Sequence, residues 1–430
     1  MNNNDIFNIC LAKKLSGGGT YESKSVTPDF SNGDVTVSPD EGYDALTSVT
    51  IEKDVDLIAD NIRKDTEIFG ITGTLDSGSD TATLDALIDG SPISISNSRV
   101  TAIRQYAFYF DTGLTSASFP NVESVGACAF QGSNLNTVDI PKITSLPTNI
   151  FSSCLLTSAD FPNVTSIDTS SFYNCSRLTS VDIPNATSIG NGAFSGCSKL
   201  TSVDFPNVTS IGSNVFQGCT SLATVNFPSA TSIGTNAFQG CRLLTSVSST
   251  EFPNVTSLPI GVFNSCASLT SVSFPDVISL GQNVFKDCKS LTSVNLPSVT
   301  SIDSNCFSGC SNLPSINLPS VTSIQSNAFY ACQNLVLADF LSLSSIKSVA
   351  FNKCSRLNTV ILRKSDSICT LENVNGFTYT PFTNGGTGGT LYVPQALIAS
   401  YQADTNWATV LGWNANNKIL AIEGSPYENP

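Results

Sequence analysis

The stretch Leu200-Thr-Ser-Val-Asp-Phe-Pro-Asn-Val-Thr-Ser-Ile-Gly-Ser-Asn-Val-Phe-Gln-Gly-Cys219 decides the fold, because close copies of it recur along the middle of the chain. Aligned on the phenylalanine near their end, twelve units follow one another in steps of 21 or 22 residues, apart from one step of 25. A period in this range is typical of a solenoid, in which each unit stacks on its neighbours. The long step comes from the insertion Ser248–Glu251, which we expect to bulge from one turn without breaking the stack. The aligned residues are Phe108, Phe130, Phe151, Phe172, Phe194, Phe216, Phe238, Phe263, Phe285, Phe307, Phe329 and Phe351.

Each unit predicts two short strands. Leu200, Val203 and Phe205 follow the alternation of a strand with one buried face, so we expect them to point inward and the polar residues between them to point outward. Pro206 has no N–H for a sheet and is expected to end this strand. A second extended segment, residues 208–211, follows the proline, and a turn or one helical loop leads from it to the phenylalanine.

Ten units carry a cysteine three residues after the phenylalanine, which raises the question of disulfides or metal binding. Neighbouring turns lie about 4.8 Å apart with their side chains pointing the same way, and parallel Cβ vectors are poor disulfide geometry. We therefore expect buried thiols that fill a small apolar slot. The cysteines are Cys154, Cys175, Cys197, Cys219, Cys241, Cys266, Cys288, Cys310, Cys332 and Cys354, and the first two units have Asp111 and Ser133 instead.

The second outward position of the first strand forms the one row of residues with binding chemistry. Its aspartates and asparagines would stack on adjacent turns, as a strip for a cation, a basic peptide or sugar hydroxyls. The alternative interpretation is a solvated strand face that is kept polar to prevent aggregation. The candidate ligand-binding residues are Asp139, Asp160, Asp182, Asp204, Asn226, Asn295, Asn317 and Asp339.

Asparagines in Asn-X-Thr sequences recur at one place in several units. We interpret them as part of the repeat and not as glycosylation sites, because the start of the chain lacks the pattern of a secretory signal. They are Asn163, Asn185, Asn207 and Asn254.

Composition argues against several function classes. The net charge is −14, which argues against nucleic acid or an anionic membrane as a partner. The chain has no histidine, so Ser-His and Cys-His nucleophile pairs and histidine metal sites are excluded, and no phosphate-binding Gly-rich loop occurs. We therefore expect a protein that is not an enzyme and uses no metal or cofactor. Without a signal-like start or a run of 18 apolar residues, it is expected to be made in a cytoplasm and not exported by the ordinary route.

The repeat resembles the BspA-like class of bacterial leucine-rich repeats. The stretch Leu178-Thr-Ser-Val-Asp-Ile-Pro-Asn-Ala-Thr-Ser-Ile-Gly-Asn-Gly-Ala-Phe-Ser-Gly-Cys197 carries nearly all the residues that are typical of that unit, and the resemblance covers about residues 91–365. It implies a β-rich leucine-rich-repeat solenoid of about twelve 22-residue repeats. Residues 391–401 and 406–407 resemble the module that closes such arrays. A closing module is expected, because the end of a solenoid exposes apolar surface and needs a cap. We expect Tyr401, Trp407 and Trp413 in the core of that cap.

Residues 26–34, 41–51 and 61–74 resemble short β-modules of tail and fibre proteins from bacteriophages. Residues 1–80 hold 15 acidic and 6 basic residues, so this part differs in charge from the array. Asn32-Gly33 and the Gly70–Gly73 segment are turn signals between extended runs. The chain is thus divided into an arm and Gly-rich linker (1–20), a small all-β module (21–80), the solenoid with a short capping helix at 81–90 (81–365) and a C-terminal cap (366–430).

The leading functional hypothesis is a non-enzymatic bacteriophage virion protein of the tail, baseplate or capsid surface. Residues 1–80 would contact other virion proteins, and the solenoid would recognise a host-surface protein or polysaccharide. The alternative is a BspA-like adhesin on the surface of a bacterium. An enzyme is the third and least favoured class.

Overall fold

The structure is a computed structural model that describes residues 35–37, 49–51, 67–68, 71–72, 93–383 and 386–429. The chain divides into two compact units, residues 1–156 and 157–430, which are described one after the other. Both contain stacked turns of about 22 residues, so the predicted leucine-rich-repeat solenoid is confirmed. The predicted linker, the Asn32-Gly33 turn and the helix at 81–90 lie outside the described residues.

The described residues of unit 1 contain three antiparallel strand pairs, β1–β2, β3–β4 and β4–β6, and the first turns of a parallel solenoid. The short strands β3 and β4 pair antiparallel with Ile68 opposite Ile71, as the turn signal at Gly70 predicts. β4 also pairs antiparallel with β6, whereas the pairs β6–β8, β5–β7 and β7–β9 are parallel. The strands of this unit are β1 (Val35–Val37), β2 (Val49–Ile51), β3 (Glu67–Ile68), β4 (Ile71–Thr72), β5 (Ile93–Ser96), β6 (Ala102–Ile103), β7 (Leu114–Ser118), β8 (Ser124–Val125), β9 (Thr137–Asp139) and β10 (Ser145–Leu146).

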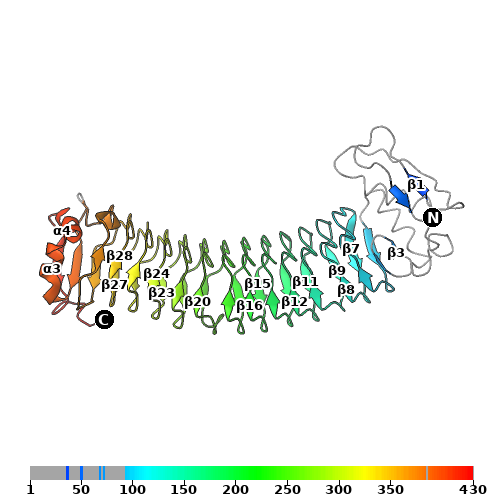
Figure 1. Cartoon of the computed structure of the whole chain (residues 1–430), viewed down its shortest axis with the longest axis horizontal. Helices are drawn as coiled ribbons and strands as arrows, with labels where there is room; N and C mark the ends of the chain where they lie inside the picture. Colours follow the sequence, from blue (N-terminus) through cyan, green and yellow to red (C-terminus); the bar gives the residue numbers. More distant parts are fainter. Residues whose placement is uncertain are drawn as a thin grey trace. The chain divides into compact units, whose positions relative to one another are not determined.

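Each repeat of unit 2 has a longer strand and a two-residue strand, and successive turns lie side by side in chain order (Figure 1). The pairing is parallel and in register, so that Ser202 lies opposite Thr224 and Ser210 opposite Ser232. The longer strands are β11 (Ser158–Asp160), β13 (Ser180–Asp182), β15 (Ser202–Asp204), β17 (Thr224–Asn226), β19 (Ser246–Ser248), β21 (Ser271–Ser273), β23 (Ser293–Asn295), β25 (Ser315–Asn317), β27 (Leu337–Phe340) and β29 (Thr359–Leu362). The shorter strands are β12 (Ser166–Ile167), β14 (Ser188–Ile189), β16 (Ser210–Ile211), β18 (Ser232–Ile233), β20 (Ser257–Leu258), β22 (Ser279–Leu280), β24 (Ser301–Ile302), β26 (Ser323–Ile324), β28 (Ser345–Ile346) and β30 (Thr370–Leu371).

The alternation of side chains follows the prediction from sequence. Leu200, Val203 and Phe205 are buried, whereas Ser202 and Asp204 of β15 are exposed. The strand ends before the proline, and the predicted second segment contains β16. Each turn therefore buries one face of each strand and leaves a polar face outside.

Phenylalanine rings form a continuous stack through unit 2. From Phe172 to Phe351 the rings of successive turns are stacked with centroids 5.1 to 6.0 Å apart. The turns also approach closely at Gly212, where an added Cβ would lie 2.8 Å from the carbonyl carbon of Gly190. Glycine is needed there because two backbones touch.

The insertion bulges without breaking the stack, as predicted. The backbone N–H and the hydroxyl of Ser248 both donate to the Glu251 carboxylate, at 2.8 and 2.7 Å, which closes a small turn. β19 still pairs in register with β21, and Phe252 stacks on Phe227 with centroids 5.7 Å apart. The extra residues of this repeat are thus accommodated as a small loop at the surface of the stack.

The last turns are closed by a module of helices and strands. The sheet of longer strands continues in parallel through β31 (Thr390–Val393) and β32 (Lys418–Ala421), beyond residue 365. The helical elements are η3 (Val374–Phe377), η4 (Gln395–Leu397), α3 (Ile398–Ala403) and α4 (Thr405–Gly412).

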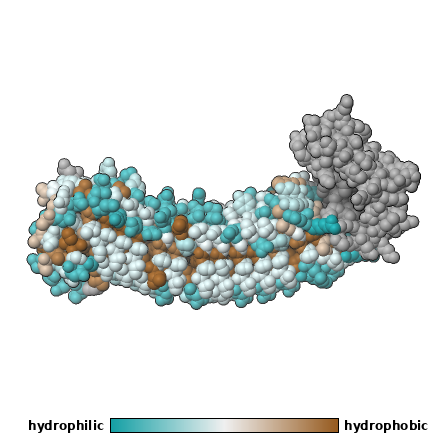
Figure 2. All heavy atoms as spheres, viewed as in Figure 1, coloured by the Kyte–Doolittle hydropathy of each residue, from teal (hydrophilic) through white to brown (hydrophobic). Residues whose placement is uncertain are grey.

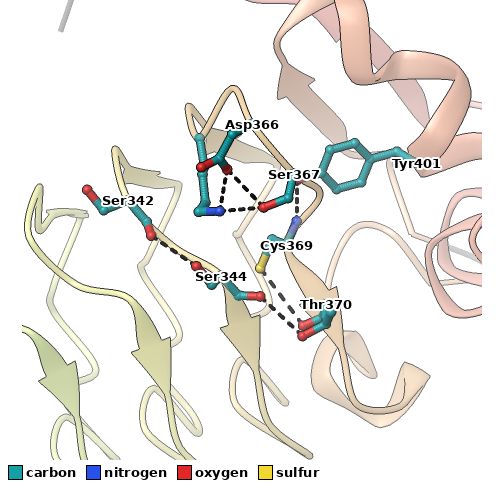
Figure 3. Close-up of polar contacts among 8 residues, drawn as sticks. Ser342, Ser344, Asp366, Ser367, Cys369, Thr370 and Tyr401 are labelled. Carbon is teal, nitrogen blue, oxygen red and sulfur yellow. Dashed lines mark hydrogen bonds and ion pairs between the residues drawn. The ribbon is translucent and has the colours of Figure 1, made fainter.

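The core of this module is formed by Tyr401 and Trp407, as predicted. The Tyr401 hydroxyl accepts from the Cys369 N–H at 2.8 Å (Figure 3), and the Trp407 indole N–H donates to the Cys369 carbonyl at 2.7 Å. Trp407 also packs on Phe377, which continues the ring stack. Trp413 is half-exposed and not a core residue, because it lies at the C-terminal end of α4.

Candidate ligand-binding face

The outward side of the longer strands of unit 2, from β11 to β29 and on through β31 and β32, is here called the strand face, and its outward side chains are polar from β11 to β25. Six of the predicted binding residues lie exposed on it, in one row. A second row consists of the serines and threonines that begin β11 to β25, all of them exposed except the half-buried Ser271. The side of the molecule drawn in Figure 2 combines pale areas of intermediate hydropathy with teal areas and a brown, hydrophobic band along the array. The six residues are Asp160, Asp182, Asp204, Asn226, Asn295 and Asn317.

Asp160 and Asp182 form the most acidic place on the strand face. The two residues lie directly opposite each other in the parallel pair of β11 and β13. Within the part of the chain that the structure describes, neither carboxylate has a hydrogen-bond or ion-pair partner. Like charges in facing positions of a sheet repel, so this pair favours a ligand that brings positive charge or hydrogen-bond donors.

Further along the row, carboxylates and amides bind one another. The Asn226 amide donates to the Asp204 carboxylate at 2.9 Å, and the Asn295 amide donates to the Ser273 hydroxyl at 2.9 Å. These pairs tie adjacent turns together and occupy part of each group's hydrogen-bonding capacity. From β15 onward the row therefore carries fewer carboxylates, and more of its polar groups are hydrogen-bonded to one another.

Asp139 belongs to unit 1 and is exposed at the end of β9. Its carboxylate accepts a hydrogen bond from the Ser118 hydroxyl at 2.9 Å. This bond joins adjacent turns of unit 1, as the bond between Asn226 and Asp204 does in unit 2.

Asp339 is not available to a ligand. It is buried, and its carboxylate binds the Arg363 guanidinium through two bonds, at 2.7 and 2.8 Å. Asp339 was predicted as a binding residue from its position in the row alone. That position gives no sign of Arg363, which lies 24 residues later and reaches back over the strand. Asp339 is a structural residue of the last turns.

The threonine hydroxyls next to the strands are also used within the stack. Thr187 donates to the Thr165 carbonyl oxygen at 3.1 Å, and Thr231 donates to the Thr209 carbonyl oxygen at 3.2 Å. The exposed serines Ser180 and Ser202 have no such bond within the described residues. Ser180, Ser202 and the facing carboxylates of Asp160 and Asp182 are thus the groups of the strand face that have no hydrogen-bond partner within the described residues.

The cysteines form a buried row, as predicted, but their slot is not purely apolar. In unit 2 each thiol of the row from Cys197 to Cys354 donates to a carbonyl oxygen of the preceding turn, at 3.0 to 3.3 Å. Every acceptor is the aligned phenylalanine of that turn. Burial raises the pKa of the Cys219 and Cys266 thiols to about 12. Such thiols keep their protons, which makes them poor nucleophiles and metal ligands.

The asparagines of the Asn-X-Thr sequences bind the neighbouring turn. The Asn185 amide donates to the Pro162 carbonyl oxygen at 2.7 Å, and the Asn207 amide donates to the Pro184 carbonyl oxygen at 2.9 Å. The same side-chain nitrogen would carry a glycan. The contact gives these asparagines a structural role, in agreement with their interpretation as part of the repeat.

Sequence reasoning missed two surface features. Arg363 and Tyr427 meet at the end of the strand face, where the arginine donates to the Tyr427 carbonyl oxygen at 2.7 Å. In unit 1, Tyr106, Tyr109 and Phe110 form an exposed cluster with edge-to-face ring contacts. The sequence signal for this cluster is three aromatic residues at places where most later units have small or polar residues.

Metal-binding clusters and membrane-spanning helices are absent from the described residues. Among the described residues, no group of three or more Cys, Asp or Glu side chains is placed to hold a metal ion. In the same part of the chain, none of the helices has the length and apolar character needed to span a membrane.

Parallel turns, a stacked phenylalanine core and an outward polar strand face define a leucine-rich-repeat protein. The chain belongs to the family described as BspA type leucine rich repeat region, whose model matches residues 101–207, 187–298 and 278–380. A comparison with curated proteins found no match.

Solved structures that are similar to this chain come from several bacteria. A leucine-rich repeat protein from Bacteroides ovatus is 22% identical, with a TM-score of 0.60 over 75% of this chain and 88% of the other. A leucine rich cell surface protein from Faecalibacterium prausnitzii is 23% identical, with a TM-score of 0.42 over 69% and 94%. The pneumococcal vaccine antigen PcpA is 14% identical, with a TM-score of 0.43 over 76% and 84%. None of these comparisons supports the phage-like module expected within residues 26–74, most of which lies outside the described residues.

Proposed function

We propose that the chain is a bacterial cell-surface adhesin that binds a polar ligand, a host-surface protein or polysaccharide, through the strand face of unit 2. Membership of the BspA-type family carries this proposal, because proteins of this family are typically exposed on the bacterial surface. The family therefore favours the adhesin over the virion protein that the N-terminal resemblance suggested. Leucine-rich-repeat proteins generally act as binding scaffolds and not as enzymes.

The chemistry of the strand face supports the binding role. Repeat duplication places the same polar group every turn, so the face offers a regular array to an extended ligand. Asp160 and Asp182 add two unpaired carboxylates in facing positions. A ligand with amino groups or hydroxyl groups would relieve their repulsion and complete their hydrogen bonds.

Location on the cell is tested with antibodies against the full chain. Intact cells of the source bacterium should bind the antibody, and mild protease treatment of the cells should remove the signal. Recovery of the protein in purified phage particles, with no signal on intact cells, would overturn the proposal.

The binding face is tested with the full chain on arrays of host glycans and extracellular proteins. We expect saturable binding to one class of ligand and at least tenfold weaker binding for the Asp160→Ser/Asp182→Ser variant. The matched control is Asp168→Ser/Asp276→Ser, which removes the same charge from exposed positions outside the strand face. If both variants bind like wild type, the acidic row is only solvated surface.

A further inference from the structure

The strand face changes character at its C-terminal end. The exposed row of acids and amides ends at Asn317, and the next positions in register are Asp339, Ile361, Tyr392 and Leu420. Ile361 occupies an outward position of β29 and is nevertheless fully buried. Something therefore covers the outer surface of the sheet at this end.

Part of the cover is Arg363, which lies two residues after Ile361 and thus on the same side of the strand. Its guanidinium binds the Asp339 carboxylate on the preceding strand through Nε and Nη2. The side chains of this pair are only 7% and 13% exposed. A charge pair held through two bonds fixes the direction of the remaining nitrogen, Nη1.

The rest of the cover is a segment of the chain itself, residues 422–429. Nη1 of Arg363 donates to the Tyr427 carbonyl oxygen at 2.7 Å, and the Tyr427 ring meets the Tyr392 ring edge to face at a centroid distance of 5.0 Å. Within the segment, the Tyr427 N–H donates to the Ser425 hydroxyl at 3.1 Å. The start of the segment is held by the Ile422 N–H, which donates to the Val393 carbonyl oxygen at 3.0 Å, and by the Glu423 carboxylate, which accepts from the Gln395 N–H at 2.9 Å. At the outward positions of the sheet, its contacts are the carbonyl and the ring of Tyr427.

We propose that this end of the strand face is a peptide-binding subsite, which residues 422–429 occupy in the free protein. The partner is an extended peptide with an aromatic residue that takes the place of Tyr427. Asp339 neutralises the charge of Arg363, so the subsite favours a neutral main-chain carbonyl over a carboxylate. Tyr392 supplies the ring contact, and Ile361 and Leu420 supply apolar surface on either side of it. The subsite does not depend on the acidic row, so its test is independent of the test of the strand face.

The probe is a fluorescently labelled peptide of residues 422–429, Ile-Glu-Gly-Ser-Pro-Tyr-Glu-Asn, and the readout is fluorescence anisotropy. The full-length Tyr427→Ala variant weakens the internal segment and should bind the peptide at least tenfold more tightly than wild type. Wild type binds poorly because its own segment competes at an effective concentration on the order of millimolar. A peptide with alanine in place of its tyrosine should lose this binding.

Arg363 is tested in the Tyr427→Ala background. Arg363→Gln alone leaves a buried carboxylate, so the variant is Asp339→Asn/Arg363→Gln, which removes both charges. We expect at least a tenfold loss of peptide binding, whereas the control Arg356→Gln, at an exposed loop position, should bind normally. Equal binding by wild type and Tyr427→Ala, or no binding by either, would overturn the proposal.

Discussion

At the scale of single residues, the Cys219 thiol shows what a repeat pattern predicts and what it misses. The row of cysteines indicated burial, and Cys219 is fully buried. The sequence did not reveal that the thiol donates to the Phe194 carbonyl oxygen at 3.2 Å, because an acceptor on another turn leaves no mark at the position itself. The prediction of Asp339 as an exposed binding residue differs from the structure for the same reason, since its partner Arg363 lies in the next turn.

The acceptor changes the expected result of substitution. Serine at position 219 can keep a donor to the Phe194 carbonyl, whereas alanine removes the donor and leaves a small cavity. We expect Cys219→Ser to lower the free energy of unfolding by about 1 kcal/mol or less, and Cys219→Ala by about 1–2 kcal/mol. Urea unfolding of unit 2, followed by circular dichroism, gives the order. If serine lowered the free energy of unfolding more than alanine, the slot would have to be interpreted as purely apolar.

At the scale of elements, unit 2 depends on how closely one turn approaches the next. The strand positions were predictable because buried and exposed residues alternate, as in Leu200 to Phe205. The distance between turns was not, because it is set by backbone contacts such as that of Gly212 with Gly190. The sequence showed only that a glycine recurs there.

Alanine at position 212 should therefore force two turns apart. The added Cβ has no flexible neighbour to displace, so we expect Gly212→Ala to cost about 2–3 kcal/mol, as overpacking does. Gly412→Ala is the control, because no atom lies within 4 Å of its Cβ position, and should be neutral or slightly stabilising in α4. Thermal midpoints of the two variants measure the difference. Equal midpoints for Gly212→Ala and Gly412→Ala would mean that the backbone of the neighbouring turns can shift to accommodate the added Cβ.

The cysteine row also predicts how stability depends on pH. In the unfolded chain a thiol loses its proton near its ordinary pKa of 9.0, whereas the folded Cys219 thiol keeps it to about 12. Above pH 9 the folded state binds more protons than the unfolded state, so the free energy of unfolding falls as pH rises. The fall is up to about 1.4 kcal/mol per pH unit for each such thiol.

The measurement is the urea midpoint between pH 8 and 11, in the presence of reductant. The variant Cys219→Ser/Cys241→Ser/Cys266→Ser removes three members of the row and should show a shallower fall than wild type. An unchanged slope would assign the alkaline loss to other groups.

At the scale of the whole molecule, the solenoid class and the need for a cap at its end were predictable from the repeat. The details of the cap were not, because it follows no repeat: Trp407 binds the last turn, whereas Trp413 is half-exposed. Their roles depend on the placement of α4, which the sequence pattern does not specify. The proposed function rests on family membership and on the strand face together.

The cap predicts a gradient of stability along unit 2. Each turn of a solenoid is stabilised by its neighbours, so loss of the cap should act first on the last turns and fade with distance. Trp407→Ala removes the ring that packs on Phe377 and the donor to the Cys369 carbonyl, at an expected cost of about 3–5 kcal/mol. Hydrogen exchange should then accelerate most around residues 351–377 and little around residues 200–220. Trp413→Ala should leave exchange unchanged. Uniform acceleration along unit 2 would show that it unfolds as one cooperative body, and that the cap stabilises all turns equally.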